Sequence, residues 1–266
     1  MKTIAIANQK GGCGKTTTAV NLSAACAMKG YRVLVVDLDP QAHTTLAFGI
    51  KANDLNVTLY DAIVNENTSI SDIILTTNVA NLDIAPSHIL LSGAEMELAI
   101  RYARESVLSE KLKAVKDNYD LCIIDCSPSL SILTINAMVA SDEVIIPIQT
   151  HYYAIEGLKQ ILDSIEIVRE RFSCNLDSMK ILFTFVDERT LLSRDVQSQI
   201  REYFSDMVFQ TVIHNCIRLA EAPAAGAPVL TYDVACKGAN EYRELANEVC
   251  NHETEIRTTE KSFLHI

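Results

Sequence analysis

A glycine-rich segment near the start of the chain has the residue types and spacing of a phosphate-binding loop. It runs Lys10-Gly-Gly-Cys-Gly-Lys-Thr16, between an apolar run at 3–7 and a helical pattern that begins at Lys15. Glycines allow successive backbone N–H groups to converge on one anion, and the N-terminus of the next helix favours negative charge. The pattern therefore predicts a P-loop nucleotide site rather than a plain glycine-rich turn. The residues expected to contact the nucleotide are Lys10, Gly11, Gly12, Cys13, Gly14, Lys15, Thr16 and Thr17.

Two lysines distinguish this loop from the common Gly-x-x-x-x-Gly-Lys-Ser/Thr pattern. Gln9 stands where that pattern has its first glycine, and Lys10 opens the loop. We expect Lys15 to reach the β- and γ-phosphates and the Thr16 hydroxyl to bind Mg²⁺. Thr17 is expected to donate to the α-phosphate. Taken alone, Lys10 could be an ordinary solvated surface lysine.

Carboxylates stand at the ends of two apolar runs farther along the chain. Asp37 and Asp39 end the first run, and Asp125 ends the run that begins at Leu121. A carboxylate near Mg²⁺ can hold a coordinated water, and one near the γ-phosphate can orient the attacking water. The alternative for each is capping or turn formation. Because the P-loop is present, we predict that Asp125 contacts Mg²⁺ through water.

Short apolar runs alternate with longer amphipathic stretches along the chain. This alternation predicts an α/β fold of the P-loop NTPase type, with a mostly parallel, twisted sheet and helices on both faces. The expected strands are Thr3–Ala7, Arg32–Leu38, Asn81–Ala85, Leu121–Asp125, Glu143–Ile148, Lys180–Phe185 and Val208–Ile213. The expected helices are Lys15–Lys29, Glu95–Lys116, Ile155–Arg171, Leu192–Phe204 and Tyr242–Cys250, and residues 49–80 look irregular.

The parallel sheet also predicts where the polar residues gather. Ligands of such sheets bind outside the carboxyl ends of the strands. Asp37, Asp39, Asp125 and Gln149 all fall at or just past expected strand ends. We therefore expect these four side chains to share one edge of the sheet with the loop.

Composition and charge narrow the class of protein. The 266 residues have a formal net charge of −11, which opposes general coating of nucleic acid or anionic membrane but permits a local basic patch. The eight cysteines form no C-x-x-C pair, and no apolar run has the length of a membrane span. We expect a cytoplasmic protein with reduced thiols and one domain over residues 1–250, followed by a flexible tail over 251–266.

Several segments, in combination and in order, resemble the ParA/Soj branch of the ParA–MinD ATPases over nearly the whole chain. They are A-N-Q-K-G-G-C-G-K-T-T-T-A-V-N-L at 7–22, V-L-V-V-D-L-D-P-Q-A at 33–42, Y-D-L-C-I-I-D-C-S-P-S-L at 119–130, I-P-I-Q-T-H-Y-Y-A-I-E-G-L at 146–158, D-E-R-T-L-L-S at 187–193 and R-L-A-E-A-P-A-A-G-A-P-V at 218–229. Lys10 matches the additional lysine of the family's deviant Walker A motif.

The resemblance implies a function that the residues alone do not. ATP with Mg²⁺ would drive formation of a sandwich homodimer in which Lys10 reaches the opposite nucleotide. Asp39 matches the water-activating aspartate and Asp37 the neighbouring metal-site aspartate, so Lys10, Lys15 and Asp39 are the implied catalytic residues. The dimer would bind the DNA of the nucleoid without preference for a base sequence. A ParB-like partner would stimulate hydrolysis during partition of plasmids, chromosomes or other cargo.

Two further sets of residues are carried over from the resemblance. The family often reads P-R-N-V-R-L where this chain has His214-Asn-Cys-Ile-Arg-Leu219, so His214 and Cys216 are expected adenine contacts through main-chain groups. The candidate DNA contacts are Arg189, Arg218 and Lys237, of which the first two match family positions associated with DNA contact; Arg194 and Arg201 are weaker candidates. The alternative for each is an ordinary surface cation.

Two other classes of P-loop ATPase are alternatives. A MinD-like membrane-cycling switch needs a basic amphipathic helix at its end, and the segment 251–266 is mixed in charge without a wide apolar face. No stable membrane association is therefore expected. A metallocluster carrier needs thiolate ligands at a dimer interface, and Cys122 lies inside an apolar run while Cys126 has no C-x-x-C partner.

Overall fold

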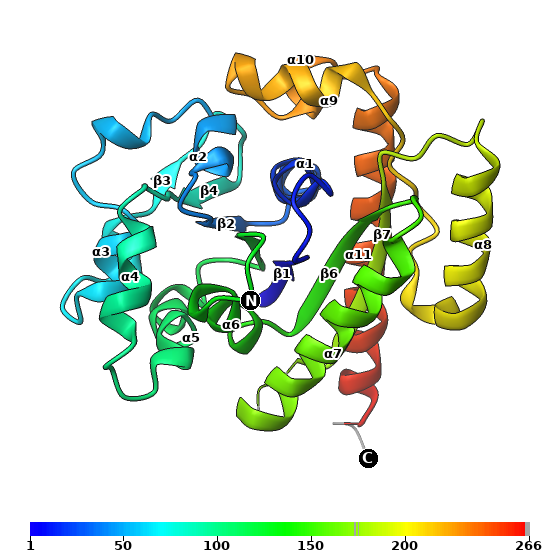
Figure 1. Ribbon diagram of the computed structural model, residues 1–266. Helices are drawn as coiled ribbons and strands as arrows, with labels where there is room; N and C mark the ends of the chain where they lie inside the picture. The colour runs from blue at the N-terminus through cyan, green and yellow to red at the C-terminus, as the bar shows by residue number, and fades with distance from the viewer. Residues whose placement is uncertain (173, 175, 264–266) are drawn as a thin grey trace.

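A seven-stranded sheet forms the centre of the molecule in the computed structural model, which describes residues 1–172, 174 and 176–263, with side chains described no farther than 250 (Figure 1). The strand order is β3-β4-β2-β5-β1-β6-β7. All neighbouring strands run parallel except the edge pair β3 and β4, which is antiparallel. The strands are β1 (Lys2–Ile6), β2 (Val33–Leu38), β3 (Leu75–Thr76), β4 (Leu82–Ala85), β5 (Leu121–Cys126), β6 (Glu143–Gln149) and β7 (Ser178–Thr184).

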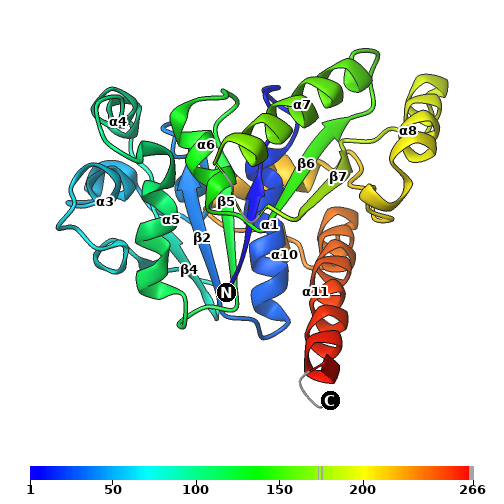
Figure 2. The same cartoon turned by 90° about the horizontal axis from the view of Figure 1, so that it is seen from below.

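Helices cover both faces of this sheet, as the alternating pattern predicted (Figure 2). Side chains of one strand point alternately to the two faces. Ile4 and Ile123 face α1 and α11, whereas Ala5 and Ile124 face the layer that contains α5 to α8. The α-helices are α1 (Lys15–Met28), α2 (His43–Ala47), α3 (Leu59–Val64), α4 (Leu91–Leu98), α5 (Val107–Leu112), α6 (Ile132–Val139), α7 (Ala154–Phe172), α8 (Leu191–Phe204), α9 (Ile217–Glu221), α10 (Val229–Tyr232) and α11 (Lys237–Phe263).

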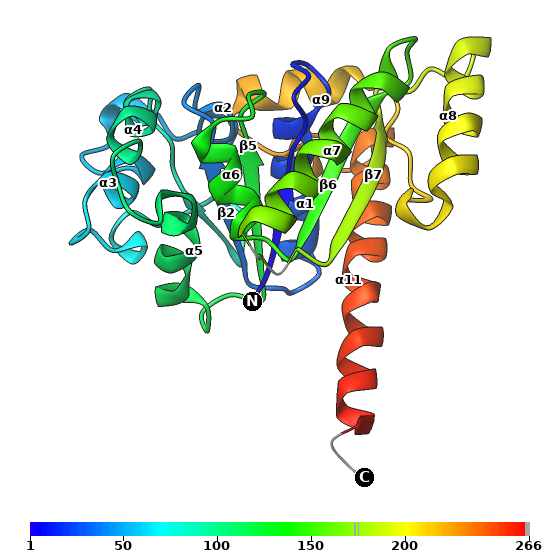
Figure 3. The same ribbon diagram turned by 60° about the horizontal axis from the view of Figure 1, so that its bottom comes forward.

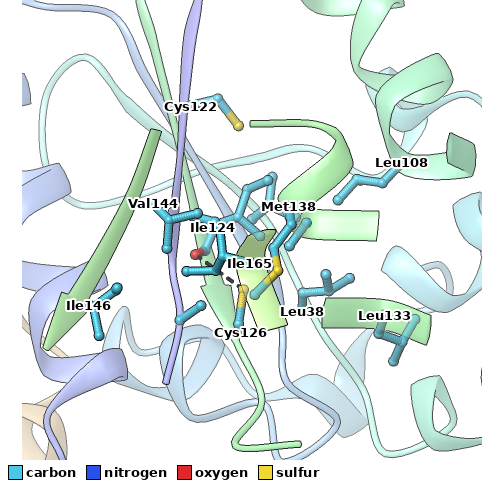
Figure 4. Packing of buried hydrophobic residues seen from close by; sticks show 14 of the residues in the cluster. Leu38, Leu108, Cys122, Ile124, Cys126, Leu133, Met138, Val144, Ile146 and Ile165 are labelled. Carbon is cyan, nitrogen blue, oxygen red and sulfur yellow. Dashed lines mark hydrogen bonds between the residues drawn. The ribbon is translucent and has the colours of Figure 1, made fainter. Parts of the chain in front are cut away.

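The two central strands β2 and β5 are buried along their whole length, which explains their almost unbroken apolar sequences. Figure 4 shows the packing beside β5, where Cys122 and Cys126 lie among Ile124, Val144 and Met138. Burial raises the pKa of both thiols well above the usual range of cysteine. Both cysteines are therefore small apolar core residues.

The predicted single helix Glu95–Lys116 is wrong, because the chain breaks between α4 and α5. Ala103 takes a left-handed conformation with φ 51°, and the short 3₁₀ helix η3 (Arg104–Ser106) follows it. Asn136 of α6 replaces the missing helical hydrogen bonds: its Nδ2 donates to Arg104 O at 2.8 Å, and its Oδ1 accepts from Leu108 N at 3.0 Å. A side chain from a distant helix thus stabilises the break.

The predicted strand Val208–Ile213 is also wrong. Only isolated bridges join this region to β7, at the pairs Ile181–Val208 and Val186–His214. The Glu248 carboxylate of α11 instead accepts the Gln210 and Thr211 N–H groups, at 2.9 and 2.7 Å. Those backbone donors are thereby satisfied without a continuous ladder.

Two other regions are more ordered than the sequence pattern indicated. Residues 49–80 contain α3, whose Thr58–Asp61 capping box fixes its start, together with β3 and the 3₁₀ helices η1 (Ala52–Asp54) and η2 (Ile70–Asp72). Helix α11 begins at Lys237 rather than near Tyr242 and its backbone continues to Phe263, beyond the rest of the molecule (Figure 3). The expectation of a flexible tail over 251–266 falls outside the residues whose side chains are described. The remaining 3₁₀ helices are η4 (Lys113–Val115), η5 (Ser205–Met207) and η6 (Ala222–Ala225).

Candidate nucleotide site

The glycine-rich loop connects the carboxyl end of β1 to the first turn of α1, as predicted. Gly12 and Gly14 have φ of 73° and 89°, a region that side chains with a Cβ rarely adopt. Gln149 Nε2, at the end of β6, donates to Gly12 O at 2.7 Å, and Thr184 Oγ1, at the end of β7, donates to Cys13 O at 2.7 Å. Two neighbouring strands therefore hold the carbonyls of Gly12 and Cys13, an arrangement that suits a loop whose N–H groups serve an anion.

The two lysines of the loop differ in environment. Lys15 is 7% exposed, and its Nζ donates to Lys10 O at 3.0 Å across the loop. Lys10 is exposed, and its Nζ contacts Nε2 of His151, a residue that the sequence analysis did not single out. Lys10 N donates to Asn8 Oδ1 at 3.0 Å. Lys15 thus points across the loop, whereas Lys10 lies at the exposed rim of the loop.

Thr16 and Asp125 come together as a magnesium site requires. Thr16 Oγ1 donates to Asp125 Oδ2 at 2.8 Å, and Thr44 Oγ1 donates to the same oxygen at 2.7 Å. Asp125 Oδ1 is buried and accepts no hydrogen bond from the residues that the structure describes. A buried carboxylate oxygen without a donor, beside a threonine hydroxyl, suits a hard cation that takes oxygen ligands. The residues present therefore fit Mg²⁺.

Asp37 lies beside this site but is held by other contacts. It is the register partner of Asp125 across the β2–β5 pair. Its Oδ2 accepts from Thr45 N and Thr45 Oγ1, at 2.7 and 2.6 Å. Burial, and then the nearby charge of Asp125, raise the pKa of Asp37; burial also raises the pKa of Asp125 despite its hydrogen bonds from Thr44 and Thr16.

Asp39 stands just past the end of β2 and is 8% exposed. Its Oδ1 accepts from Gln41 N at 2.9 Å, a turn contact like the one that was the alternative for this residue. Its carbonyl oxygen accepts from Ser87 Oγ at 2.7 Å, which ties this loop to the end of β4. One carboxylate oxygen of Asp39 is thus used in the turn.

The predicted adenine segment lies next to the loop through β7. Asn215 N donates to Val186 O at 3.2 Å, two residues past the strand that holds Cys13. His214 N and Nδ1 both contact the Glu241 carboxylate, at 2.9 and 2.6 Å. A main-chain contact from His214 to a base would therefore use its carbonyl oxygen. Cys216 is half-buried, and the adenine role of both residues stays a prediction.

The three predicted DNA contacts are exposed cations that are each paired with an acid. Arg189 pairs with Asp187 at 2.7 Å, Arg218 with Glu221 at 2.7 Å, and Lys237 with Glu241 at 3.7 Å. Of the weaker candidates, Arg194 is exposed. Arg201 instead packs over the Phe183 ring and donates to Phe209 O, so its side chain supports the core.

Three residues of the site were missed by sequence reasoning. Thr44 and Thr45 lie two and three residues after Ala42, and paired hydroxyls just after such a turn were an available signal. His151 lies far from Lys10 in sequence, so no local pattern connected the two.

Within the residues that the structure describes, no helix is long and apolar enough to cross a membrane. The same residues contain no group of three or more His, Cys, Asp or Glu side chains placed to hold a metal ion. Fewer protein ligands suffice for a Mg²⁺ ion that keeps several waters.

Known proteins share both the sequence and the architecture of this chain. Residues 1–178, which include the loop and all three aspartates, match a family model described as an AAA domain. The sporulation initiation inhibitor protein Soj of Bacillus subtilis is 48% identical over 93% of this chain and 98% of its own length. The chromosome partitioning protein ParA of Caulobacter vibrioides is 42% identical over 95% of each chain. Cobyrinic acid a,c-diamide synthase from Mycobacterium smegmatis, solved with bound ADP and magnesium, has a TM-score of 0.82 at 33% identity and covers 96% of both chains.

Proposed function

The chain belongs to the AAA domain family and to its ParA/Soj partition ATPases, and we propose that it is an ATPase that dimerises when ATP is bound. The dimer binds DNA without sequence preference and moves or positions a plasmid, a chromosome or other cargo. A ParB-like protein stimulates hydrolysis and ends each cycle.

The observation that carries this proposal is the meeting of Thr16, Asp125 and Lys15 at one edge of the sheet. ATP and Mg²⁺ are the ligands that this set fits, in keeping with the neighbour solved with ADP and magnesium. Bound Mg²⁺ neutralises phosphate charge and orients the phosphate oxygens. Thr16 and Asp125 would hold the ion, and Asp37 would add negative charge beside it. Lys15 and the loop N–H groups bind the phosphates.

Asp39 is proposed to orient the attacking water and accept its proton. The carboxylate is 8% exposed and uses its Oδ1 in the turn, and its Oδ2 is the oxygen proposed to meet the water. Positioning of this kind is a large part of catalysis in phosphoryl transfer. We expect weak intrinsic hydrolysis, because full activation requires the partner protein.

Dimerisation rests on Lys10. Its exposed position at the rim of the loop, with the ammonium against His151, supports a role toward a nucleotide held by a second copy. ATP then acts as the signal that joins two chains.

DNA binding is proposed at Arg189, Arg218 and Lys237. Each of these cations is paired with a carboxylate of its own chain, with which a DNA phosphate must compete, so a single chain should bind weakly. Two chains double the contacts and couple ATP to DNA through effective concentration. The proposed setting is the cytoplasm, on nucleoid DNA, with residues 1–250 acting as one domain.

Three variants test the proposal by size-exclusion chromatography and DNA-shift assays with Mg·ATP. Lys15→Ala should abolish ATP binding. Lys10→Ala should bind ATP but remain a monomer. Asp39→Ala should accumulate as an ATP-bound dimer on DNA, because binding survives while hydrolysis is lost. Asp163→Ala, on the exposed face of α7, is the matched control and should behave as the parent. If Asp39→Ala stays monomeric with ATP and does not bind DNA at low salt, the proposed partition function is wrong. Only the assignment as a P-loop ATPase would then remain.

A further inference from the structure

The ammonium of Lys10 is held by its own chain. Lys10 Nζ contacts His151 Nε2. His151 sits between β6 and α7, where its N–H donates to Gln149 O at 3.0 Å and its carbonyl accepts from Ala154 N at 2.9 Å. The backbone of His151 is therefore held on both sides, while the lysine side chain is long and flexible. His151 is the fixed partner of the pair.

The chemistry of this contact requires a neutral imidazole. A lysine ammonium has three donors and no lone pair, so His151 Nε2 must accept. The imidazole proton then resides on Nδ1, which is buried and has no partner among the described residues. A second proton on the ring would remove the acceptor and place two positive charges in contact.

We infer that His151 is a positioning residue that retains Lys10 on its own protomer and releases it when the imidazole becomes protonated. This role rests on the proposed function, in which Lys10 must leave its own chain to reach the partner's nucleotide. Only the fraction of molecules with a released Lys10 is competent to dimerise, and the apparent dimer affinity is reduced by that fraction. The histidine thereby sets the threshold at which ATP assembles the dimer.

Other titratable groups face His151 from the phosphate loop and from the residues next to it. The titratable groups that line the same small cavity are Lys10, Cys13 and Tyr153. Lys15 faces Lys10 from the other side of the loop. The ordinary pKa of histidine is about 6.5, whereas the ordinary pKa values of cysteine, tyrosine and lysine are higher. Burial raises the pKa of Cys13 further.

Two substitutions distinguish the effect of the hydrogen-bond acceptor at residue 151 from the effect of its protonation. His151→Phe removes the acceptor, whereas His151→Gln keeps a neutral acceptor that cannot be protonated. Dimer dissociation constants are measured by analytical ultracentrifugation with Mg²⁺ and a non-hydrolysable ATP analogue, at pH 6, 7 and 8. At pH 8, His151→Phe should dimerise about tenfold more tightly than the parent, since a hydrogen bond to a charged group is worth roughly that factor. His151→Gln should match the parent at pH 8.

The pH profile is the readout that a merely structural role would not move. The dimer affinity of the parent should rise toward that of His151→Phe as the pH falls to 6. Neither variant should show this rise in dimer affinity. His88→Gln, which removes a histidine that accepts from Leu90 N, should keep the profile of the parent. If His151→Phe is unstable, the comparison of His151→Gln with the parent decides alone.

The outcomes separate this inference from the function on which it rests. Equal affinities and equal pH profiles in the parent and the His151 variants would overturn the role of His151 and leave the ATP-gated dimer intact. A parent protein that stays monomeric at every pH would overturn both.

Discussion

Asp37 and Asp125 stand opposite each other as register partners of β2 and β5, and both carboxyl groups are completely buried. Two carboxylates cannot both ionise at low cost in such a place, because each lacks water and feels the other's charge. Thr44, Thr45 and Thr16 supply hydroxyl donors, and Lys15 adds a positive charge. The nucleotide-free site is thus electrostatically costly until a cation arrives.

The stability of the nucleotide-free protein should therefore fall with rising pH. The folded-state pKa of both aspartates is raised, so their contribution is fully present below the ordinary carboxyl pKa and is lost as the pH rises through the raised values. Thermal unfolding followed by circular dichroism should show a melting temperature that drops by several degrees between about pH 5 and pH 8. Asp37→Asn should flatten this dependence. An identical slope in that variant would contradict the assignment.

Asp125→Asn should weaken magnesium binding far more than nucleotide binding. The amide retains an acceptor for Thr16 and Thr44 but loses the negative charge that attracts the ion. We expect the Mg²⁺-dependent gain in ATP affinity, measured by isothermal titration calorimetry with and without Mg²⁺, to fall by about 10–100-fold. Asp163→Asn should leave it unchanged. A full magnesium effect in Asp125→Asn would place the ion elsewhere.

Gly14→Ala should destabilise the fold and the phosphate loop together. A Cβ at this position would sit 3.2 Å from the Phe185 ring, on a backbone with φ of 89°. We expect the free energy of unfolding in urea to fall by about 1–3 kcal/mol, with a loss of ATP affinity. Gly93→Ala is the matched control, because it lies within α4 with no atom near its Cβ. That change should raise stability by up to about 1 kcal/mol.

Substitution of the paired surface cations should change the salt dependence of DNA binding. Arg189→Ala or Arg218→Ala should each lower the slope of log affinity against log salt concentration by about one. Asp187→Asn should act in the opposite direction and tighten binding, since it releases Arg189 from its ion pair. Fluorescence anisotropy with a random-sequence duplex measures these slopes. Arg201→Ala should cost stability and leave the slope unchanged, because that side chain packs on Phe183.

Much of the architecture follows from local sequence. The loop at residues 10–16 is contiguous, so glycine, lysine and threonine at fixed spacing were enough to identify it. Strands β2 and β5 are apolar on both faces because helices cover the sheet on both sides, and this pattern is visible without a structure. Their carboxyl ends necessarily share one edge, which is why Asp37 and Asp125 were expected together.

Other features depend on side chains that arrive from distant segments, and no periodicity encodes them. Asn136 stabilises the break that divides residues 95–116, and Glu248 takes the place of a β-ladder along residues 208–213. In both regions, the local preference for a helix or a strand gives way to hydrogen bonds from a distant segment, which form only in the folded chain. The contact of His151 with Lys10 has the same origin. The sequence by itself determined a nucleotide loop with two lysines, and the tertiary structure alone decided which group holds the outer one, because that partner is 141 residues away along the chain.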